Sequence, residues 1–388
     1  TFEYSAIQKT TTPLMRLSQS IVGNQEAAAL TEVVLNDGYL GMGTHVGNFE
    51  EEIASFLGVP KEWVICLSSG TAALQLAVQA VTEPEDEVLV QSLTFVASYQ
   101  AISATKANPV SCDVNLETIT IDLRDAENRL TQKTRAIMPV HYASNPGNLE
   151  KIYQFAQKHK LRTIEDAAHA FGCTYNGKKI GSFGDIVCFS FDGIKNITSG
   201  EGGCIVTDNE IVLQKVRDAR LLGVEEDTDK RYSGQRSWDF DTTCQGWRFH
   251  MSNIMAAIGI EQLKRFPVFA LKRQNLAKKY DQLFSSHPKI HPISRDYNTV
   301  VPHIYVVQIH GMKNRKHIQD ELLSKGIQVG YHYQPNHWLS LYKNEWNKPL
   351  TITDSVFPEL ISLPLHPELS ETDVDYVVAD LTRLIENE

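Results

Sequence analysis

The chain of 388 residues has few of the features that mark several large classes of protein. Its six cysteines are widely spread and contain no C-x-x-C pair, so neither a disulfide framework nor a zinc site is predicted. No apolar run approaches the ~20 residues of a membrane span, and the polar N-terminal segment does not resemble a signal peptide. Acidic residues outnumber basic ones by 47 to 37, and the net charge of -10 disfavours a nucleic-acid surface. We therefore expect a cytoplasmic protein that binds neither nucleic acid nor membrane.

Several common catalytic motifs are absent as well. The sequence contains no Walker loop, no H-E-x-x-H and no G-x-S-x-G. The segment with Gly41, Gly43 and Gly47 has one residue too many for a dinucleotide-binding fingerprint, and a helix-like segment precedes it where a strand is required. These observations disfavour other α/β nucleotide enzymes, and no motif predicts a metal site.

What is present between about residues 62 and 207 is an alternation of short apolar runs with amphipathic segments. Such alternation predicts parallel strands joined by crossover helices, which is an α/β fold. In sheets of this kind, ligands bind beyond the carboxyl ends of the strands. Strands are expected at 63–67, 87–91, 109–113, 135–142, 161–165, 186–191 and 204–207, and helices at 71–81, 95–104 and 149–159.

The flanking segments have a different pattern. Two helices, 25–36 and 48–57, are expected before this core, and two long helices, 252–266 and 270–285, after a polar stretch at 225–241 that we interpret as a loop. A strand at 305–310, a helix at 316–325, a strand at 327–333 and a capped helix at 370–388 complete the chain. The change of pattern predicts a large domain over 1–265 and a smaller α+β domain over 266–388.

Polar residues follow the ends of several expected strands. Ser69, Gly70 and Thr71 link the first strand to a helix, whose first turn suits a phosphate, although Ser and Thr also serve as ordinary helix caps. Ser190, at another strand end, is a further phosphate candidate. Phe95, after the second strand, is either a core residue or an aromatic that lies on a planar ring.

Asp166 and Lys195 are the most informative of these residues. Asp166 follows an apolar strand and can either cap a helix or keep a pyridine nitrogen protonated. His169 then either packs in the core or hydrogen-bonds a ring hydroxyl. Lys195 follows an apolar strand and precedes a Gly-Glu-Gly-Gly turn, so it is either an exposed loop lysine or the amine that forms a Schiff base. A lysine and an aspartate at neighbouring strand ends suit pyridoxal phosphate (PLP), which has an aldehyde and a basic ring nitrogen.

The order of these motifs resembles the DegT/StrS family of nucleotide-sugar aminotransferases. The resemblance rests on S-S-G-T-A-A-L, the Thr94–Phe95 pair, E-D-A-A-H, F-S-F-D-G-I-K and G-E-G-G, and it extends over nearly the whole chain. Further matching segments are 38–43, 251–257, 332–337 and 363–366. The resemblance implies the aspartate-aminotransferase fold (PLP fold type I), with a mostly parallel central sheet, and a homodimer whose active sites are built from both subunits.

The resemblance also assigns roles to the residues. It implies that Lys195 is the catalytic lysine that binds PLP covalently, that Asp166 faces the pyridine nitrogen and that Phe95 stacks on the ring. The phosphate would lie against Gly70, Thr71 and Ser190, and the ring hydroxyl near His169. Family members often carry Gly-x-Asn-x-Arg-Met, whose asparagine reaches the phosphate in the neighbouring subunit. Here Arg248 stands in its place, and it could bind that phosphate, a substrate diphosphate or an interface carboxylate.

The reaction implied is a two-stage transamination. L-glutamate gives its amino group to PLP, leaving 2-oxoglutarate and pyridoxamine phosphate (PMP), and a nucleotide-linked keto sugar then receives the amino group. Lys195 indicates amino transfer, because relatives that remove a hydroxyl carry histidine there. The Thr198–Gly203 segment favours a 4-keto-6-deoxy sugar, destined for lipopolysaccharide or a related surface glycan. Alternatives are a 3-keto sugar, a non-nucleotide ring substrate, and a PLP-binding regulatory module without activity.

Overall fold

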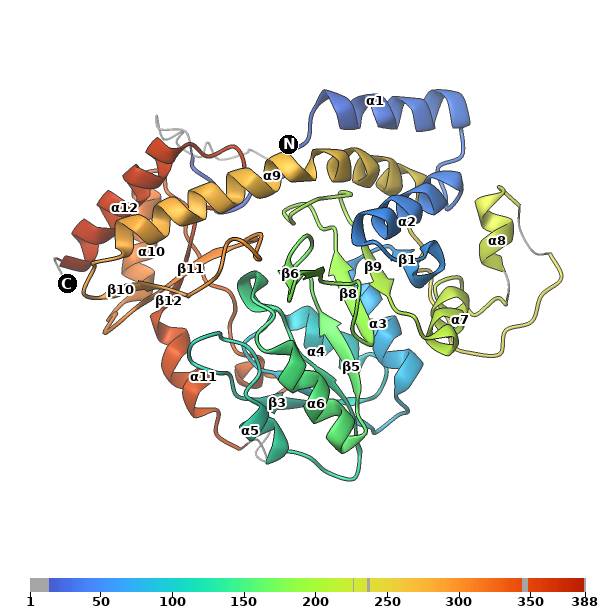
Figure 1. Ribbon diagram of the computed structural model, residues 1–388, viewed down its shortest axis with the longest axis horizontal. Helices are drawn as coiled ribbons and strands as arrows, with labels where there is room; N and C mark the ends of the chain where they lie inside the picture. The colour runs from blue at the N-terminus through green and yellow to red at the C-terminus, as the bar shows by residue number, and fades with distance from the viewer. Residues whose placement is uncertain (1–13, 226, 236–237, 344–347, 387–388) are drawn as a thin grey trace, which may run out of the picture.

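The computed structural model describes residues 14–225, 227–235, 238–343 and 348–386. Its centre is a seven-stranded sheet with the order β1-β9-β8-β5-β4-β2-β3, which is covered by helices on both faces (Figure 1). The strands are β1 (Val64–Leu67), β2 (Glu87–Gln91), β3 (Asn108–Cys112), β4 (Thr134–Met138), β5 (Arg162–Asp166), β8 (Ile186–Ser190) and β9 (Gly203–Val206). The predicted α/β fold is confirmed.

Strand direction follows from the connections between strands. β3, β2, β4, β5 and β8 run parallel, and the chain passes between them through helices. β9 is antiparallel to both β8 and β1. No helix lies between β8 and β9, so the chain turns back beside the strand it has just left. The carboxyl ends of the five parallel strands therefore share one edge of the sheet.

One predicted strand is too long. The strand expected to reach residue 142 ends at Met138, because Pro139 has no N–H for the ladder. The chain then forms the 3-10 turn η3 (Tyr142–Ser144), where Ala143 and Ser144 have positive φ angles. This early end places Val140 and Ser144 beside the edge at which the parallel strands end.

Alternate residues of the strands enter two hydrophobic cores. In β1, Val64 and Cys66 pack in one core, and Ile65 and Leu67 in the other. The first core lies under α2 (Thr44–Leu57), α6 (Leu149–His159) and part of α9 (Asn253–Phe284). The second lies under α3 (Gly70–Val81), α4 (Val96–Ser103) and α7 (Glu210–Ala219). The helix predicted at 48–57 begins four residues earlier, at Thr44. The chain also contains α1 (Asn24–Glu32), η1 (Val33–Asp37), η2 (Lys61–Trp63), α5 (Leu123–Glu127), β6 (Thr174–Tyr175) and β7 (Lys178–Lys179).

The two long helices expected at 252–266 and 270–285 are in fact one. The 32-residue α9 runs through Pro267 without interruption and crosses the molecule in Figure 1. A proline inside a helix costs ~3 kcal/mol, because it removes one hydrogen bond and crowds the preceding turn. Burial of Phe266 and Phe269 on either side of the proline offsets this cost. A domain boundary near residue 266 would therefore lie within a helix, and the division into 1–265 and 266–388 stays a prediction.

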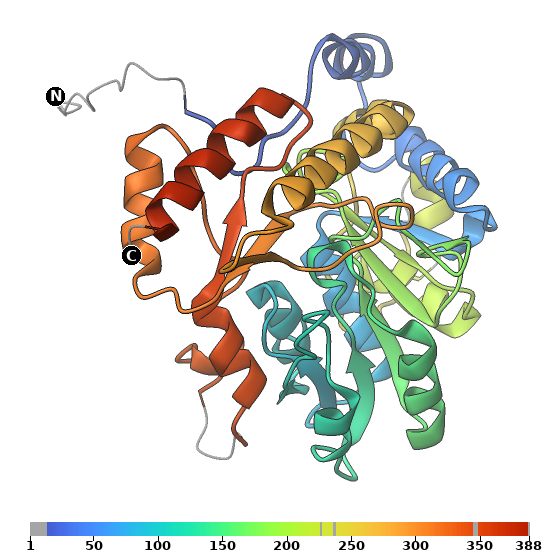
Figure 2. The same ribbon diagram turned by 60° about the vertical axis from the view of Figure 1, so that its left-hand side comes forward.

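A second sheet of three antiparallel strands follows α9. It consists of β10 (Ile290–Pro292), β11 (Tyr305–Ile309) and β12 (Leu360–Leu363), with β11 in the middle. It shares a core with α9, α10 (Arg315–Ser324) and α12 (Glu371–Glu386), and Figure 2 shows α10 and α12 to one side of the main sheet. Between α10 and β12 lie η4 (Asn336–Trp338), α11 (Thr351–Val356) and η5 (Phe357–Glu359).

The strand predicted at 327–333 does not form. This segment makes only isolated bridges, from Ile327 to Met15 and from Gly330 to Ser362. β12 takes the position beside β11 instead, with Tyr305 opposite Leu363. The 327–333 segment, which lies outside the second sheet, places His332 and Tyr333 beside the main sheet.

The polar stretch at 225–241 is not entirely a loop. It contains the short helix α8 (Asp227–Tyr232), while residues 226, 236 and 237 lie outside the described ranges. Tyr232 is partly buried, and its hydroxyl hydrogen-bonds the buried Glu50–Arg220 ion pair. Within the described ranges, no helix combines the length and the apolar character needed to cross a membrane.

Candidate active site

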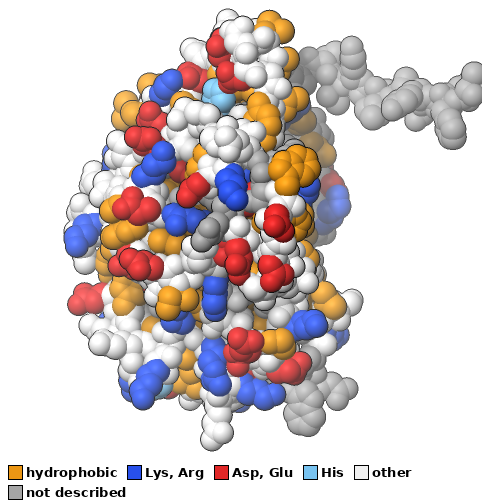
Figure 3. Space-filling view, turned by 90° about the vertical axis from the view of Figure 1, so that its right-hand side faces the viewer, with side chains coloured by type: hydrophobic (Ala, Val, Ile, Leu, Met, Phe, Trp, Pro, Cys, Tyr) orange, Lys and Arg blue, Asp and Glu red, His pale blue; other side chains and the backbone are white. Residues whose placement is uncertain are grey.

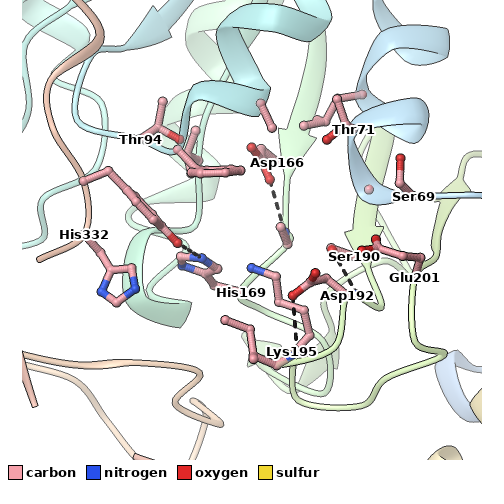
Figure 4. A pocket seen from close by; sticks show the side chains of 18 residues that line it. Ser69, Thr71, Thr94, Asp166, His169, Ser190, Asp192, Lys195, Glu201 and His332 are labelled. Carbon is pink, nitrogen blue, oxygen red and sulfur yellow. Dashed lines mark hydrogen bonds between the residues drawn. The ribbon is translucent and has the colours of Figure 1, made fainter. Parts of the chain in front are cut away.

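A cavity of about 370 Å³ opens at the edge where the parallel strands end (Figure 4). Side chains from β5, β8 and the starts of α3 and α4 meet there, together with the segment that follows α10. Seven of the eight predicted site residues line it: Gly70, Thr71, Phe95, Asp166, His169, Ser190 and Lys195. Residues that are scattered over 126 positions of the sequence are therefore brought to one site.

The first turn of α3 forms one wall. Ser69 caps this helix, since its Oγ accepts a hydrogen bond from the Ala72 N–H at 3.0 Å. The ordinary capping interpretation thus holds for Ser69, while the hydroxyls of Thr71 and Ser190 remain at the cavity (Figure 4). A Cβ on Gly70 would lie 2.7 Å from the Ser190 Cβ. Glycine at this position therefore allows the positive end of α3 to approach the end of β8.

Asp166 lies at the end of β5 and is 5% exposed. Its Oδ2 accepts a hydrogen bond from Ser98 Oγ at 2.7 Å, and its Oδ1 accepts one from the Ala168 N–H at 3.2 Å. Ser98 is in turn 3.0 Å from Thr94 Oγ1. These contacts fix the carboxylate in one orientation at the cavity wall.

Phe95 and His169 form the aromatic part of the cavity. Phe95 is 53% exposed, which excludes the core interpretation, and its ring centroid lies 5.2 Å from that of Tyr333. His169 is buried, and its Nε2 is 3.0 Å from the Tyr333 hydroxyl. Burial and the nearby Lys195 charge hold the pKa of His169 well below its usual value, so this imidazole is neutral. A flat ring can stack on the exposed face of Phe95.

Lys195 follows β8 in a turn closed by its own N–H, which donates to the Asp192 carbonyl at 3.0 Å. In Figure 4 its amine points into the cavity, between His169 on one side and Ser190 and Asp192 on the other. Burial lowers the pKa of Lys195 to about 8, against the opposing charges of Asp192 and Asp166. At pH 7 about a tenth of the amine is therefore unprotonated, far more than for an ordinary lysine, and a nucleophile or base requires this form.

Other cavity residues were not identified individually from the sequence. Asp192 lies within the F-S-F-D-G-I-K motif, and His332 and Tyr333 lie within the 332–337 segment, so the motifs pointed to their neighbourhood. Burial, assisted by the charge of Lys195, lowers the pKa of His332 to about 4. Glu201, in the Gly-Glu-Gly-Gly turn, also lines the cavity, and burial raises the pKa of its carboxyl.

Arg248 does not lie on the wall of this cavity. It is exposed and pairs through its backbone with Leu221. A separate cavity of about 320 Å³ forms where the early glycine segment, with Gly43 and Thr44, meets Ser233 and Gly234 of the 225–241 stretch. The early glycine segment and the 225–241 stretch therefore meet each other away from the Lys195 cavity of the same chain, whereas the 332–337 segment reaches that cavity through His332 and Tyr333.

The residues of the Lys195 cavity fit PLP. A helix N-terminus with two hydroxyls suits the phosphate, an oriented carboxylate suits the ring nitrogen, and an amine with a lowered pKa suits the aldehyde. Gly70 is held so close to Ser190 that a side chain would block the approach of α3. His169 Nδ1 is buried and has no hydrogen-bond partner among the described residues.

Several known proteins are similar to this chain in sequence and in fold. The model of the DegT/DnrJ/EryC1/StrS aminotransferase family matches residues 21–382. A dTDP-4-dehydro-2,3,6-trideoxy-D-glucose 4-aminotransferase of Saccharopolyspora spinosa is 32% identical over 96% of this chain and 97% of its own. PseC of Helicobacter pylori, an aminotransferase involved in the biosynthesis of pseudoaminic acid, has a TM-score of 0.88 at 27% identity, over 97% of this chain and 100% of its own. Spr1654 of Streptococcus pneumoniae, in its PMP-form, has a TM-score of 0.88 at 28% identity, over 96% and 98%, and its PLP-form is also known.

The central sheet and the lysine cavity at its edge define a PLP-dependent enzyme of fold type I. The chain belongs to the DegT/DnrJ/EryC1/StrS aminotransferase family. It is a PLP-dependent aminotransferase, and the predicted fold class, family, enzyme class and cofactor are confirmed.

Proposed function

We propose that this enzyme transfers the amino group of L-glutamate to a nucleotide-linked keto sugar, at the 4-keto position of a 6-deoxy sugar. The observation that carries the proposal is the Lys195 amine in a cavity that the first turn of α3 and the Asp166 carboxylate also line. Two similar proteins favour a sugar substrate: one is a 4-aminotransferase for a dTDP-linked 4-dehydro sugar, and the other acts in pseudoaminic acid biosynthesis. The amino sugar would enter lipopolysaccharide or a related surface glycan.

Each side chain of the cavity has a separate role in the proposed reaction. PLP, when bound, supplies an aldehyde carbon that reacts with amines and a ring that withdraws electrons. The first turn of α3 and the hydroxyls of Thr71 and Ser190 would hold the phosphate, and Phe95 would support the ring. Asp166 would keep a proton at the ring nitrogen, and His169 would serve the ring hydroxyl.

Lys195 moves the proton. With PLP bound and Lys195 displaced by the amino-acid amine, Nζ would be a base within the cavity, as its pKa of about 8 permits. It would take the proton from the amino-acid α-carbon and hold it until it returns to carbon. The same role in reverse would serve the keto sugar. A histidine at this position could not bind the cofactor covalently as a lysine amine does.

We further propose a homodimer with shared active sites. The chain exposes large hydrophobic side chains after α1, among them Val34 and Leu35, at 52% and 74%. Figure 3 shows the side on which α1, α2 and α8 lie, where hydrophobic side chains are exposed among charged ones. In such a dimer the exposed Arg248 would reach the phosphate in the partner's site. All six cysteines are free, which suits the reducing cytoplasm.

The experiment that tests the proposal measures amino transfer to several candidate sugars by the wild-type protein and by a Lys195 variant. The protein would be incubated with PLP, L-glutamate and UDP-, dTDP- or GDP-linked 4-keto and 3-keto sugars, and the amino sugar and 2-oxoglutarate would be detected by mass. We expect product from a 4-keto sugar, and none with Lys195→Ala. Lys178→Ala removes an exposed lysine and is the matched control with wild-type turnover.

Each alternative predicts a different result. Product from a 3-keto sugar alone would refute the 4-keto assignment, and turnover of an aminocyclitol precursor alone would refute the nucleotide sugar. Turnover by Lys195→Ala would refute the role of Lys195, and PLP binding without any turnover would favour the regulatory module. For the dimer, co-expression of Lys195→Ala with Arg248→Ala should restore activity that neither homodimer has, because one site then regains both residues. An active monomer in gel filtration would contradict the shared site.

A further inference from the structure

His303 contacts Lys195 but does not lie on the cavity wall. Its Nε2 is 3.4 Å from the Lys195 Nζ, and the residue is 1% exposed. It precedes β11, and it is not among the residues that line the cavity. A substrate in the cavity therefore meets Lys195 and His169, and His303 acts on the substrate through these side chains, of which Lys195 is the one near its Nε2.

Backbone hydrogen bonds hold His303 in place from two directions. Its N–H donates to Ser144 Oγ at 2.9 Å, and its carbonyl accepts from the buried Arg273 guanidinium at 3.0 Å. Ser144 itself donates to the carbonyl of His169. η3 and α9 thus fix the same residue, so the imidazole has a defined position behind the amine.

The Lys195 side of the contact is fixed as well. The neighbouring Asn196 is buried, and its Nδ2 donates to the carbonyls of Phe171 at 3.1 Å and Val301 at 3.2 Å. The latter carbonyl is two residues from His303. The segments that carry the amine and the imidazole are therefore joined beside their point of contact.

The charges around the pair determine its protonation. Lys195 is faced by the carboxylates of Asp192 and Asp166, by the guanidinium of Arg273, and by the imidazoles of His169, His303 and His332. Burial, and then the charges of Lys195, His169, Arg273 and His332, hold the pKa of His303 well below its usual value. The imidazole is neutral, so Nε2 can accept an N–H of the Lys195 ammonium. Nδ1 of His303 has no hydrogen-bond partner among the described residues, and the ring also lies against that of His169, with the two centroids 4.6 Å apart.

We propose that His303 is the positioning residue of Lys195, and that its neutral Nε2 accepts an N–H of the amine whenever Nζ carries the proton taken from the substrate. The proposal rests on the proposed function, in which Lys195 moves that proton. The proton stays on Nζ until it is returned to carbon, and none passes to His303. The contact directs the protonated amine and stabilises it, so proton removal from the substrate becomes easier.

The first test uses the PLP-free protein and needs no substrate. Acetylation of Lys195 by acetic anhydride would be followed from pH 6 to 10 by peptide mass spectrometry. The wild-type midpoint should lie near pH 8. His303→Leu removes the acceptor and should lower the midpoint by about one pH unit, because a hydrogen bond to a charged group is lost. His303→Gln places an acceptor close to Nε2 and should keep the wild-type midpoint.

Controls separate this role from a structural one. His366→Asn alters another buried histidine near Arg273 and should leave the midpoint unchanged. If His303→Leu does not fold, as judged by circular dichroism, His303→Asn replaces it, since its shorter amide does not reach Nζ and should also lower the midpoint. An unshifted midpoint in the folded acceptor-free variant would overturn the proposal.

The second test follows the proton in the PLP-loaded enzyme. The exchange of the glutamate α-deuteron with solvent should be about tenfold slower in His303→Leu than in His303→Gln, with an unchanged KM for glutamate. Equal exchange rates would overturn the proposal. Turnover by Lys195→Ala would instead refute the proposed function, and it would leave the acetylation result standing.

Discussion

Replacement of Gly70 by alanine tests how closely α3 must approach β8. The added Cβ would lie 2.7 Å from the Ser190 Cβ and 3.0 Å from its Oγ, whereas ordinary contacts begin at 3.4 Å. The first turn of α3 must therefore move by about 0.7 Å. Gly203 blocks an easy adjustment, because it packs against the Gly70 backbone. Overpacking of this kind costs about 1–3 kcal/mol.

Because the displaced turn is the proposed phosphate site, we expect the cost to appear in PLP binding. At 1.4 kcal/mol for each factor of ten, Gly70→Ala should weaken PLP binding roughly 5- to 150-fold. The assay is a PLP titration of the PLP-free protein, followed by absorbance. Gly47→Ala is the matched control: its Cβ would meet Tyr232 at 3.7 Å, an ordinary van der Waals contact, so affinity should not change.

A second substitution, at Ser190, tests whether the contact between Gly70 and Ser190 causes the loss of PLP affinity. Ser190→Gly removes the Cβ and Oγ that the new side chain meets, so Gly70→Ala should cost much less in that background than in the wild type. Equal costs in both backgrounds would show that the effect does not arise from this contact. Unchanged PLP affinity in the single variant would refute the reasoning that the close approach of α3 serves the phosphate.

Three further predictions concern other parts of the chain. Covalent attachment of PLP to Lys195 should accelerate about tenfold per pH unit up to about pH 8 and then level off, because the amine loses its proton there. A rate that still rises toward pH 10 would contradict the lowered pKa of Lys195. Tyr333→Phe removes the hydroxyl 3.0 Å from His169 Nε2 and should weaken PLP binding by roughly 3- to 10-fold in the same titration. Glu50→Gln leaves the buried Arg220 guanidinium without its counter-charge, and it should lower the free energy of unfolding, measured by urea denaturation, by roughly 3–5 kcal/mol. The control Glu51→Gln alters an exposed ion pair with Lys61 and should change this free energy by less than about 1 kcal/mol.

The sheet and its site were predictable because each depends on short stretches of sequence. Short runs of four to five residues formed β1, β2, β3 and β5 close to the predicted bounds. The predicted site residues lie at strand ends, and parallel strands bring their carboxyl ends to one edge of the sheet. The position of the cavity could therefore be predicted from the strands. Errors arose where tertiary packing outweighed the local signal. Burial of Phe266 and Phe269 carries α9 through Pro267, and β12 displaces the apolar 327–333 segment from the second sheet.

The contribution of the later segments to the site could not be predicted for a different reason. His303 lies in an irregular segment that no predicted motif includes. The 332–337 segment pointed to the neighbourhood of Tyr333, but no periodicity relates this residue to the end of β8. They reach Lys195 and His169 because Arg273 of α9 holds the His303 carbonyl and Tyr142 binds the His332 carbonyl. The strand ends of the main sheet thus carry the side chains proposed to hold the cofactor, while segments beyond α9 carry groups that contact those side chains. A substitution in the loop before β11 is therefore expected to change the reactivity of Lys195 without a change in the sheet, because that loop carries His303, whose Nε2 lies 3.4 Å from the Lys195 Nζ.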